Sequence, residues 1–222
     1  MHPLLNISCL HPAKSDIAAF EAARRALGLD DVMLKHRVRS DLAAAAEEAG
    51  GPSLAMIKHT AAELMSLARG ADGLLLTAPA MGSATRAAAM LGVPIVQADL
   101  ALAEAAVREG GRVTALCATG AALSQVRALF ETAAFATGAT IEVRLVSGAA
   151  DLLAAGREAD YLQAIAEAAD HAFEDGAATV ALAHTSMAGA AGLVRTRQPL
   201  SGPAAGLAAI VAEVNAMAAQ SP

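Results

Sequence analysis

The stretch that decides the fold is TVALAHTSMAGAAG, residues 179–192, in which a strand-like run of small and branched residues ends abruptly in histidine, hydroxyl groups and glycine. A second stretch of the same kind, GLLLTAPAMGSAT, occupies residues 73–85 and has Ala78 where the later one has His184. Each pattern is typical of a buried strand followed by a polar turn and the start of a helix. The same strand–turn–helix pattern therefore occurs twice in the chain.

A second pair of stretches supports an internal repeat. LLNISCLHPAKSDIAAFEAA and RVTALCATGAALSQVRALFETAA both run strand, cysteine at the strand end, polar turn and helix, so that Cys9 matches Cys117. Self-similarity at a fixed offset indicates repeated structural units. The sequence therefore predicts two similar lobes, residues 1–110 and 111–222, related by a pseudo-twofold axis. The last helix is free to pack back on the first lobe.

Apolar, β-rich runs alternate with Ala-rich helical periods along the chain, which is typical of parallel sheets with helices on both faces. Strands are expected at residues 4–9, 32–36, 73–77, 94–97, 113–117, 140–146 and 179–183. Helices are expected at residues 16–27, 53–69, 83–91, 100–108, 124–137, 160–175 and 204–219. The predicted fold class is therefore α/β, with parallel sheets flanked by helices in each lobe.

Composition restricts the partners of the chain. Its net charge is -6, only 2% of its residues are aromatic, and no cluster of Lys and Arg has interleaved aromatic residues, which argues against nucleic acid. Residues 176–194 carry no formal charge, but their Gly, Ser, Thr and His content disfavours a membrane-spanning helix. We expect no nucleic-acid or membrane partner. Exposed alanine-rich helix faces would permit a homo-oligomer.

The amino-terminal stretch MHPLLNISCLHP lacks the basic and long apolar regions of a signal peptide, so we expect a cytoplasmic protein with reduced thiols. His36 and His59 have no partners at zinc-like spacing, and no metal site is predicted. The sequence has neither a GxGxxG nor a GxxxxGK[ST] loop, and no cofactor is expected.

The ends of the predicted strands carry the candidate site, because ligands of parallel sheets bind beyond the carboxyl ends of the strands. Turn N–H groups and hydroxyls there suit a small anion, and a carboxylate is the expected ligand. His11 is either a second imidazole at this site or a solvated turn residue. The residues predicted to surround the ligand are Cys9, Thr77, Ala78, Met81, Cys117, Thr119, His184, Thr185 and Ser186.

The two repeated motifs, together with LVSGAADLLAAGREADYLQAIAEAA, LAHTSMAGAAGLV and PLSGPAAGLAAIV, resemble the aspartate/glutamate/hydantoin racemase superfamily, which also contains arylmalonate decarboxylase and maleate isomerase. The resemblance covers essentially the whole chain. It implies cofactor-independent proton transfer between two cysteines on opposite faces of the substrate. The matching positions here are Ala78 and His184, and Pro79 removes a backbone donor beside the first.

Three interpretations of this departure are open. In the first, His184 alone transfers protons, helped by Thr185 and Ser186, unless its ring only caps a strand or fills a polar gap. In the second, Cys9 and Cys117 form a displaced pair of thiols, which would need lowered pKa values. In the third, the chain binds a small carboxylate without catalysis. We favour a racemase- or isomerase-type enzyme acting on a small amino acid or related acid, with a decarboxylase as the nearest alternative.

Overall fold

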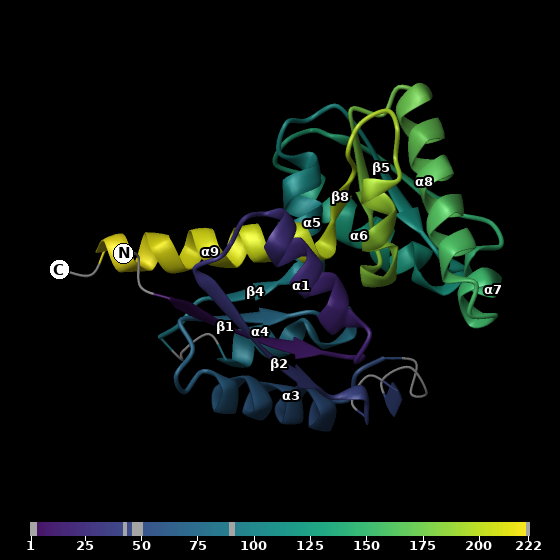
Figure 1. The fold of residues 1–222 in the computed structure, drawn as a ribbon. Coiled ribbons are helices and arrows are strands. Elements are labelled where there is room, and N and C mark those ends of the chain that lie inside the picture. Colours follow the sequence, from purple (N-terminus) through teal and green to yellow (C-terminus); the bar gives the residue numbers. More distant parts are fainter. Residues whose placement is uncertain (1–3, 42–43, 46–50, 89–91, 221–222) are drawn as a thin grey trace. The chain divides into compact units, whose positions relative to one another are not determined.

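The computed structural model describes residues 4–41, 44–45, 51–88 and 92–220. Two compact units make up the chain, one from Met1–Asp99 with Gly206–Pro222 and the other from Leu100–Ala205. Each unit contains a four-stranded parallel sheet covered by helices on both faces (Figure 1). The predicted α/β class with two similar lobes is thereby confirmed.

The sheet of unit 1 has the strand order β2-β1-β3-β4. Its strands are β1 (Leu5–His11), β2 (Val32–Val38), β3 (Gly73–Leu76) and β4 (Ile95–Gln97). Helices α1 (Asp16–Ala26) and α9 (Gly202–Gln220) cover one face, and α3 (Leu54–Leu67) and α4 (Ser83–Ala88) cover the other (Figure 1). Because successive side chains point to opposite faces, Leu10 and Leu74 pack toward α3, whereas Cys9 and His11 point to the opposite face.

Glycine lets α9 lie directly on the sheet. A Cβ atom at Gly73 would lie 2.9 Å from side-chain atoms of Ile210 and Val214, and one at Gly206 would lie 3.2 Å from Leu75. A larger residue at either position would require the neighbouring side chains to shift. The absence of a side chain at these two positions therefore sets the distance between α9 and the sheet.

The sheet of unit 2 has the order β6-β5-β7-β8, the same arrangement as in unit 1. Its strands are β5 (Arg112–Cys117), β6 (Thr140–Leu145), β7 (Thr179–Leu182) and β8 (Leu200–Ser201). Helices α5 (Ala98–Val107) and α6 (Leu123–Ala134) pack on one face, and α7 (Ala149–Ala154) and α8 (Glu158–Glu174) on the other (Figure 1). In strand order, β1 therefore corresponds to β5 and β3 to β7.

Each unit contains a helix that follows a strand of the other. Helix α5 follows β4 of unit 1, but its Leu102 and Ala103 complete the apolar cluster of unit 2 together with Val113. Helix α9 follows β8 of unit 2, but from Gly206 onward it belongs to unit 1. The observed division therefore lies between Asp99 and Leu100, rather than at residues 110 and 111, because the apolar side chains of α5 are part of the second core.

Several elements differ from the sequence-based expectations. Strand β1 continues to His11, two residues beyond its predicted end, and β8 and α7 were not predicted. The end of the helix expected at 83–91 lies outside the described residues. Residues 179–192 form β7 and the 3-10 helix η4 (Thr185–Gly192), so the uncharged stretch at 176–194 is not one long helix.

Helix α9 is the one helix in the described part of the chain that is long and apolar enough to cross a membrane. This criterion uses length and composition only, and core helices of water-soluble proteins also meet it. The contacts of Ile210 and Val214 with Gly73 show that part of this helix is packed on the sheet of unit 1.

Candidate functional site

The turns at the carboxyl ends of the strands carry most of the predicted site residues. In unit 1, Thr77 and Ala78 follow β3 and precede the 3-10 helix η1 (Pro79–Met81). In unit 2, Thr119 follows β5, and His184 follows β7 directly before η4. All strand pairs are parallel, so within each unit these turns lie at the same edge of the sheet.

His184 is a half-buried imidazole at the amino end of η4. Its side chain makes no capping hydrogen bond, and its backbone carbonyl accepts the N–H of Met187 at 3.0 Å. The ring therefore does not cap the turn. Burial lowers the pKa of His184 below its usual value, so the imidazole is neutral at neutral pH and is able to accept a proton.

The hydroxyl of Ser186 is held by the only tyrosine of the chain. Tyr161 on α8 is fully buried, and its hydroxyl lies 2.8 Å from Oγ of Ser186, which is exposed. Burial raises the pKa of Tyr161, so the phenol stays protonated. Ser186 is therefore oriented by a fixed neutral group. Sequence reasoning missed Tyr161, because its place in an amphipathic helix is typical of a core residue.

Neither thiol has the properties of a catalytic base. Cys9 and Cys117 are both 0% exposed. Burial, with the charge of Glu21, raises the pKa of Cys9 to about 12, and burial raises the pKa of Cys117 to about 11. Since the thiolate is the reactive form, these raised pKa values argue against either thiol as a base near neutral pH. Cys9 also lies within β1 rather than at its end, because the strand continues to His11.

Two predicted pocket residues are part of the core of unit 1. Met81 is 2% exposed and Ala78 is 9% exposed, and both belong to the apolar cluster that contains Leu64 and Leu76. Met81 is therefore a packing residue. Ala78 places no titratable group at the position that corresponds to His184.

His11 belongs to a chain of hydrogen bonds in unit 1. Its Nδ1 lies 2.9 Å from Oγ1 of Thr77, and its Nε2 lies 2.8 Å from Nδ1 of His36. His36 Nε2 lies 3.3 Å from a carboxylate oxygen of Glu21 on α1. At 1% exposure His11 is not a solvated turn residue, because β1 carries it into the sheet.

The arrangement of protons in which Thr77 also bonds Leu10 is the following. The Thr77 hydroxyl donates to the carbonyl of Leu10 at 3.2 Å, so its oxygen accepts the Nδ1–H of His11. His11 Nε2 then accepts from His36 Nδ1–H, and His36 Nε2–H donates to Glu21. In this arrangement the His11 ring is neutral. Burial, with His36 beside it, lowers the pKa of His11 to about 4, in agreement with this assignment.

Asp16 is a further candidate that sequence reasoning missed. It is the first residue of α1, in the segment that follows the carboxyl end of β1, and it is 8% exposed. Burial raises its pKa to about 6, and a backbone hydrogen bond at Ala13 acts in the opposite direction. A buried carboxyl group that titrates near neutral pH is a candidate acid or base. No pattern in the sequence reveals its burial.

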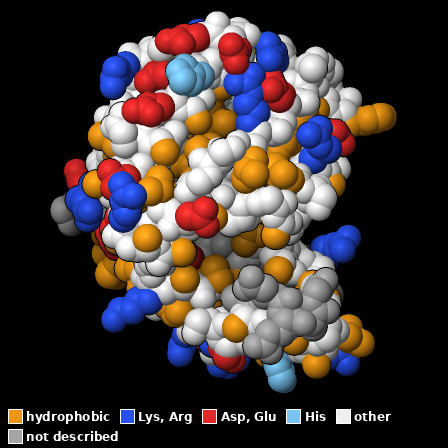
Figure 2. Space-filling view, turned by 90° about the vertical axis from the view of Figure 1, so that its right-hand side faces the viewer, with side chains coloured by type: hydrophobic (Ala, Val, Ile, Leu, Met, Phe, Trp, Pro, Cys, Tyr) orange, Lys and Arg blue, Asp and Glu red, His pale blue; other side chains and the backbone are white. Residues whose placement is uncertain are grey.

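The basic and acidic side chains are interspersed on the face drawn in Figure 2. Many of them pair with one another. Arg144 contacts Glu142 and Asp175, and the Arg144 and Arg112 guanidinium groups lower the pKa of Glu142 to about 2. These pairs join β5, β6 and the end of α8 and add no group to the candidate site.

Comparison with solved structures connects this architecture to racemases. Allantoin racemase from Pseudomonas fluorescens matches 96% of this chain and 92% of its own, with a TM-score of 0.66 and 16% identity. Glutamate racemase from Thermus thermophilus, in complex with β-chloro-D-alanine, matches 100% and 85%, with a TM-score of 0.59 and 18% identity. An aspartate racemase homologue from Pyrococcus horikoshii matches 95% and 99%, with a TM-score of 0.62 and 12% identity.

No family model matches the chain, and no curated protein matches it in sequence. The similarity to racemases is therefore one of fold, and it extends over nearly the whole chain. The resemblance that the sequence motifs indicated is confirmed at that level.

Proposed function

We propose that the chain is a cofactor-independent, racemase-type enzyme that transfers a proton at the carbon next to a carboxylate in a small amino acid or related acid. One observation carries the proposal. In a fold shared with allantoin, glutamate and aspartate racemases, the turn after β7 presents a half-buried histidine, His184, whose ring makes no capping bond.

In this proposal neutral His184 accepts the proton from the carbon next to the carboxylate. The bond electrons move into the carboxylate to form an enediolate, and the ring becomes imidazolium. Hydroxyl groups of Thr185 and Ser186 donate hydrogen bonds to the carboxylate oxygens, where the negative charge develops. Tyr161 keeps the Ser186 hydroxyl in a fixed position, which reduces the reorganisation needed in the transition state.

The stereochemical outcome depends on which group returns the proton. Return from His184 gives exchange with solvent on one face of the carbon. Return from a second group on the other face gives inversion.

Decarboxylation is the second candidate, and Ala78 is the observation that favours it. The turn after β7 carries a titratable side chain, whereas the corresponding turn after β3 carries a methyl group. A single acid on one face suits protonation of the enediolate that remains after a carboxylate leaves as carbon dioxide. The fold and the role of His184 are the same in both cases.

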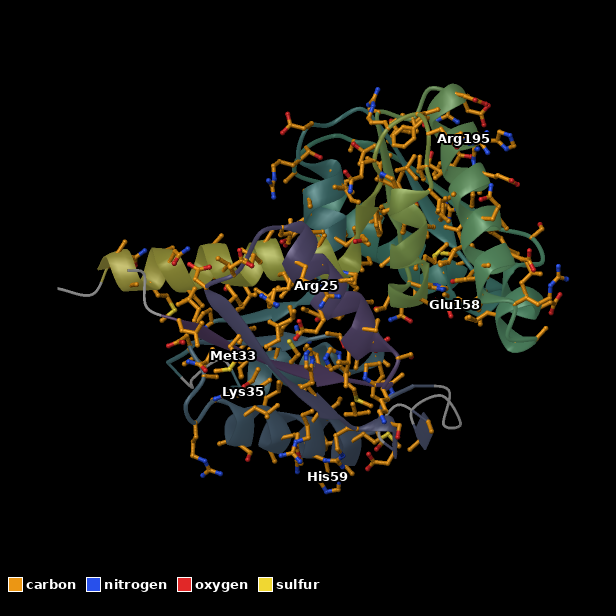
Figure 3. All side chains as sticks on the ribbon, in the orientation of Figure 1. Arg25, Met33, Lys35, His59, Glu158 and Arg195 are labelled. Atoms are coloured by element: carbon orange, nitrogen blue, oxygen red, sulfur yellow. The ribbon has the colours of Figure 1, made fainter. Side chains whose placement is uncertain are left out.

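The test is proton exchange followed by NMR in heavy water. Aspartate, glutamate, alanine, allantoin and a 2-substituted malonate are each incubated with the protein. We expect deuterium uptake at the α-carbon, or decarboxylation of the malonate, and His184→Ala should lower the rate by at least about 100-fold. The control is His59→Ala, since His59 is an exposed residue of α3 that points away from the sheet (Figure 3).

The outcomes separate the interpretations. Loss of activity in His184→Ala with full activity in His59→Ala supports the proposal. Activity that survives in His184→Ala assigns the chemistry to another group and contradicts it. A folded wild-type protein that binds one of these acids without turnover would establish a binding protein instead.

A further inference from the structure

Three side chains of types that bind metal ions, one thiol and two imidazoles, lie close together in unit 1. Cys9 and His11 are two residues apart on β1 and therefore point to the same face of the sheet. His36 on β2 is the register partner of Cys9 and points to that face as well. One ligand atom from each of the three residues lies within 4.8 Å of the other two.

Hydrogen bonds fix the orientation of both imidazole rings, as they do for histidines that bind a metal ion. Thr77 is hydrogen-bonded to Nδ1 of His11, and Glu21 is hydrogen-bonded to Nε2 of His36. The remaining nitrogens, His11 Nε2 and His36 Nδ1, face each other at 2.8 Å. Metal-binding histidines characteristically engage their other ring nitrogen with a carboxylate or similar group, which fixes the tautomer and the ring orientation.

We propose that Cys9, His11 and His36 form a binding site for a zinc-type transition-metal dication. One thiolate and two imidazoles are a ligand set that Zn²⁺ prefers, and three protein ligands leave a fourth tetrahedral position for water or another small ligand. The metal takes the place of the proton that lies between the two rings. Metal–nitrogen bonds of about 2.0–2.1 Å need the two nitrogens roughly 3.3 Å apart, so the rings separate by about half an ångström.

A Cys9 thiolate supplies one negative charge to a bound dication. The charge of Glu21 is already offset by the arginines that pair with it. Glu21 is anchored on α1 by Arg24 at 3.0 Å and by Arg25 at 3.9 Å. A bound dication removes the proton from the thiol and the shared proton from His36, and both protons pass to solvent.

Unit 2 provides a built-in comparison. Cys117 is as buried as Cys9, but its register partner on β6 is Leu145, and Thr119 stands two residues after it where His11 stands after Cys9. The thiol alone is thus common to both units, whereas the two histidines are present beside Cys9 only. The proposal concerns the first thiol and not the second.

The experiment is metal binding to the full chain after removal of metal by a chelator. Titration with Co²⁺ should give one equivalent bound, with visible bands of tetrahedral cobalt and a near-ultraviolet thiolate-to-cobalt band, and Zn²⁺ should displace it. His36→Gln should weaken binding by at least about 100-fold, and Thr77→Val, which removes the group behind His11, by about 10–100-fold. Cys117→Ala should bind as the wild type does.

Cys9→Ser gives the sharpest readout, because it should remove the thiolate-to-cobalt band. Circular dichroism shows whether each variant is folded. His36→Gln is the second variant for the case in which Cys9→Ser is not folded, because the His36 side chain is 13% exposed, whereas Cys9 is 0% exposed. Absence of cobalt binding by the folded wild type overturns the proposal. Binding that is unchanged in His36→Gln, or that is lost in Cys117→Ala, also overturns it. None of these readouts uses catalytic activity. Failure of the proposed function would therefore not contradict the metal site, and absence of metal binding would not contradict the proposed function.

Discussion

Cys9 in β1 and Cys117 in β5 occupy corresponding strands of two sheets with the same strand order, and their surroundings differ completely. Cys9 lies beside His36 on the neighbouring strand β2, and His11 follows Cys9 by two residues on β1. Cys117 belongs to an apolar cluster with Phe130 and Val126. The comparison shows that one α/β framework supports different chemistry in each unit, because the chemistry depends on the side chains next to the strand and not on the strand itself.

The largest expected effect comes from matched aromatic residues in the two cores. Phe20 on α1 packs on His11 with ring centroids 5.2 Å apart, and Phe130 on α6 packs among apolar side chains. Both are almost fully buried. Phe20→Ala and Phe130→Ala should each lower the free energy of unfolding by about 3–5 kcal/mol, because each leaves a cavity.

Urea denaturation followed by circular dichroism measures this effect. Phe135→Ala is the control, since Phe135 is 94% exposed, and its effect should stay within about 0.5 kcal/mol. Phe20→Ala could lower the free energy of unfolding by less than about 1 kcal/mol while Phe130→Ala lowers it by the expected amount. That result would mean that the core of unit 1 is packed much less tightly than that of unit 2.

The second prediction sharpens the comparison through pH. Asp16 at the start of α1 has a pKa raised to about 6, whereas α6 starts with Leu123, Ser124 and Gln125, which do not titrate. A carboxyl group whose pKa is higher in the folded state destabilises the fold above that pKa, and this cost disappears as the pH falls below about 4. Asp16→Asn should therefore stabilise the protein by about 1–2 kcal/mol at pH 7.5 and by nearly nothing at pH 4.

The measurement is the free energy of unfolding at both pH values. Asp30→Asn, at an exposed position, serves as the control and should change little at either pH. Stabilisation by Asp16→Asn that is equal at pH 4 and pH 7.5 would show that the Asp16 carboxyl group is not the titrating group.

The third prediction compares two buried threonines. Thr114 in β5 is buried, and its hydroxyl has no hydrogen-bond partner among the described residues, whereas Thr77 after β3 bonds both His11 and Leu10. Thr114→Val should stabilise the protein by about 1 kcal/mol, because it removes an unpaired buried hydroxyl. Thr77→Val should destabilise it by about 1–3 kcal/mol. Thermal unfolding of the two variants should give opposite signs, and equal signs would contradict this assignment of partners.

Hydrophobic periodicity was sufficient to predict most of the fold. The strand–turn–helix units were found because buried parallel strands are continuous apolar runs that end in turn residues. Strand β8, Leu200–Ser201, was missed because two residues give no pattern. The division of the chain was misplaced because an Ala-rich helix such as α5 does not show in its sequence which sheet it covers.

The candidate site was predictable only in part. His184 could be identified because it directly follows a predicted strand. The contact between His11 and His36 depends on the register of β1 against β2, and that of His11 with Thr77 depends on the sheet order, which places β3 beside β1. Neither can be read from one sequence, and burial, which shifts the pKa of Asp16, is likewise a property of the folded chain.

The placement of α9 has a consequence for how the chain folds during synthesis. Residues 206–220 cover the sheet of unit 1, at Gly73 and Leu75, but they are synthesised after every described strand. Domains generally fold in order as the chain leaves the ribosome. Unit 1 emerges first, and the part of its sheet around Gly73 and Leu75 stays uncovered until α9 arrives. A nascent chain of this kind is expected to need a chaperone at that face, and the order of translation, rather than stability, limits when its first unit is complete.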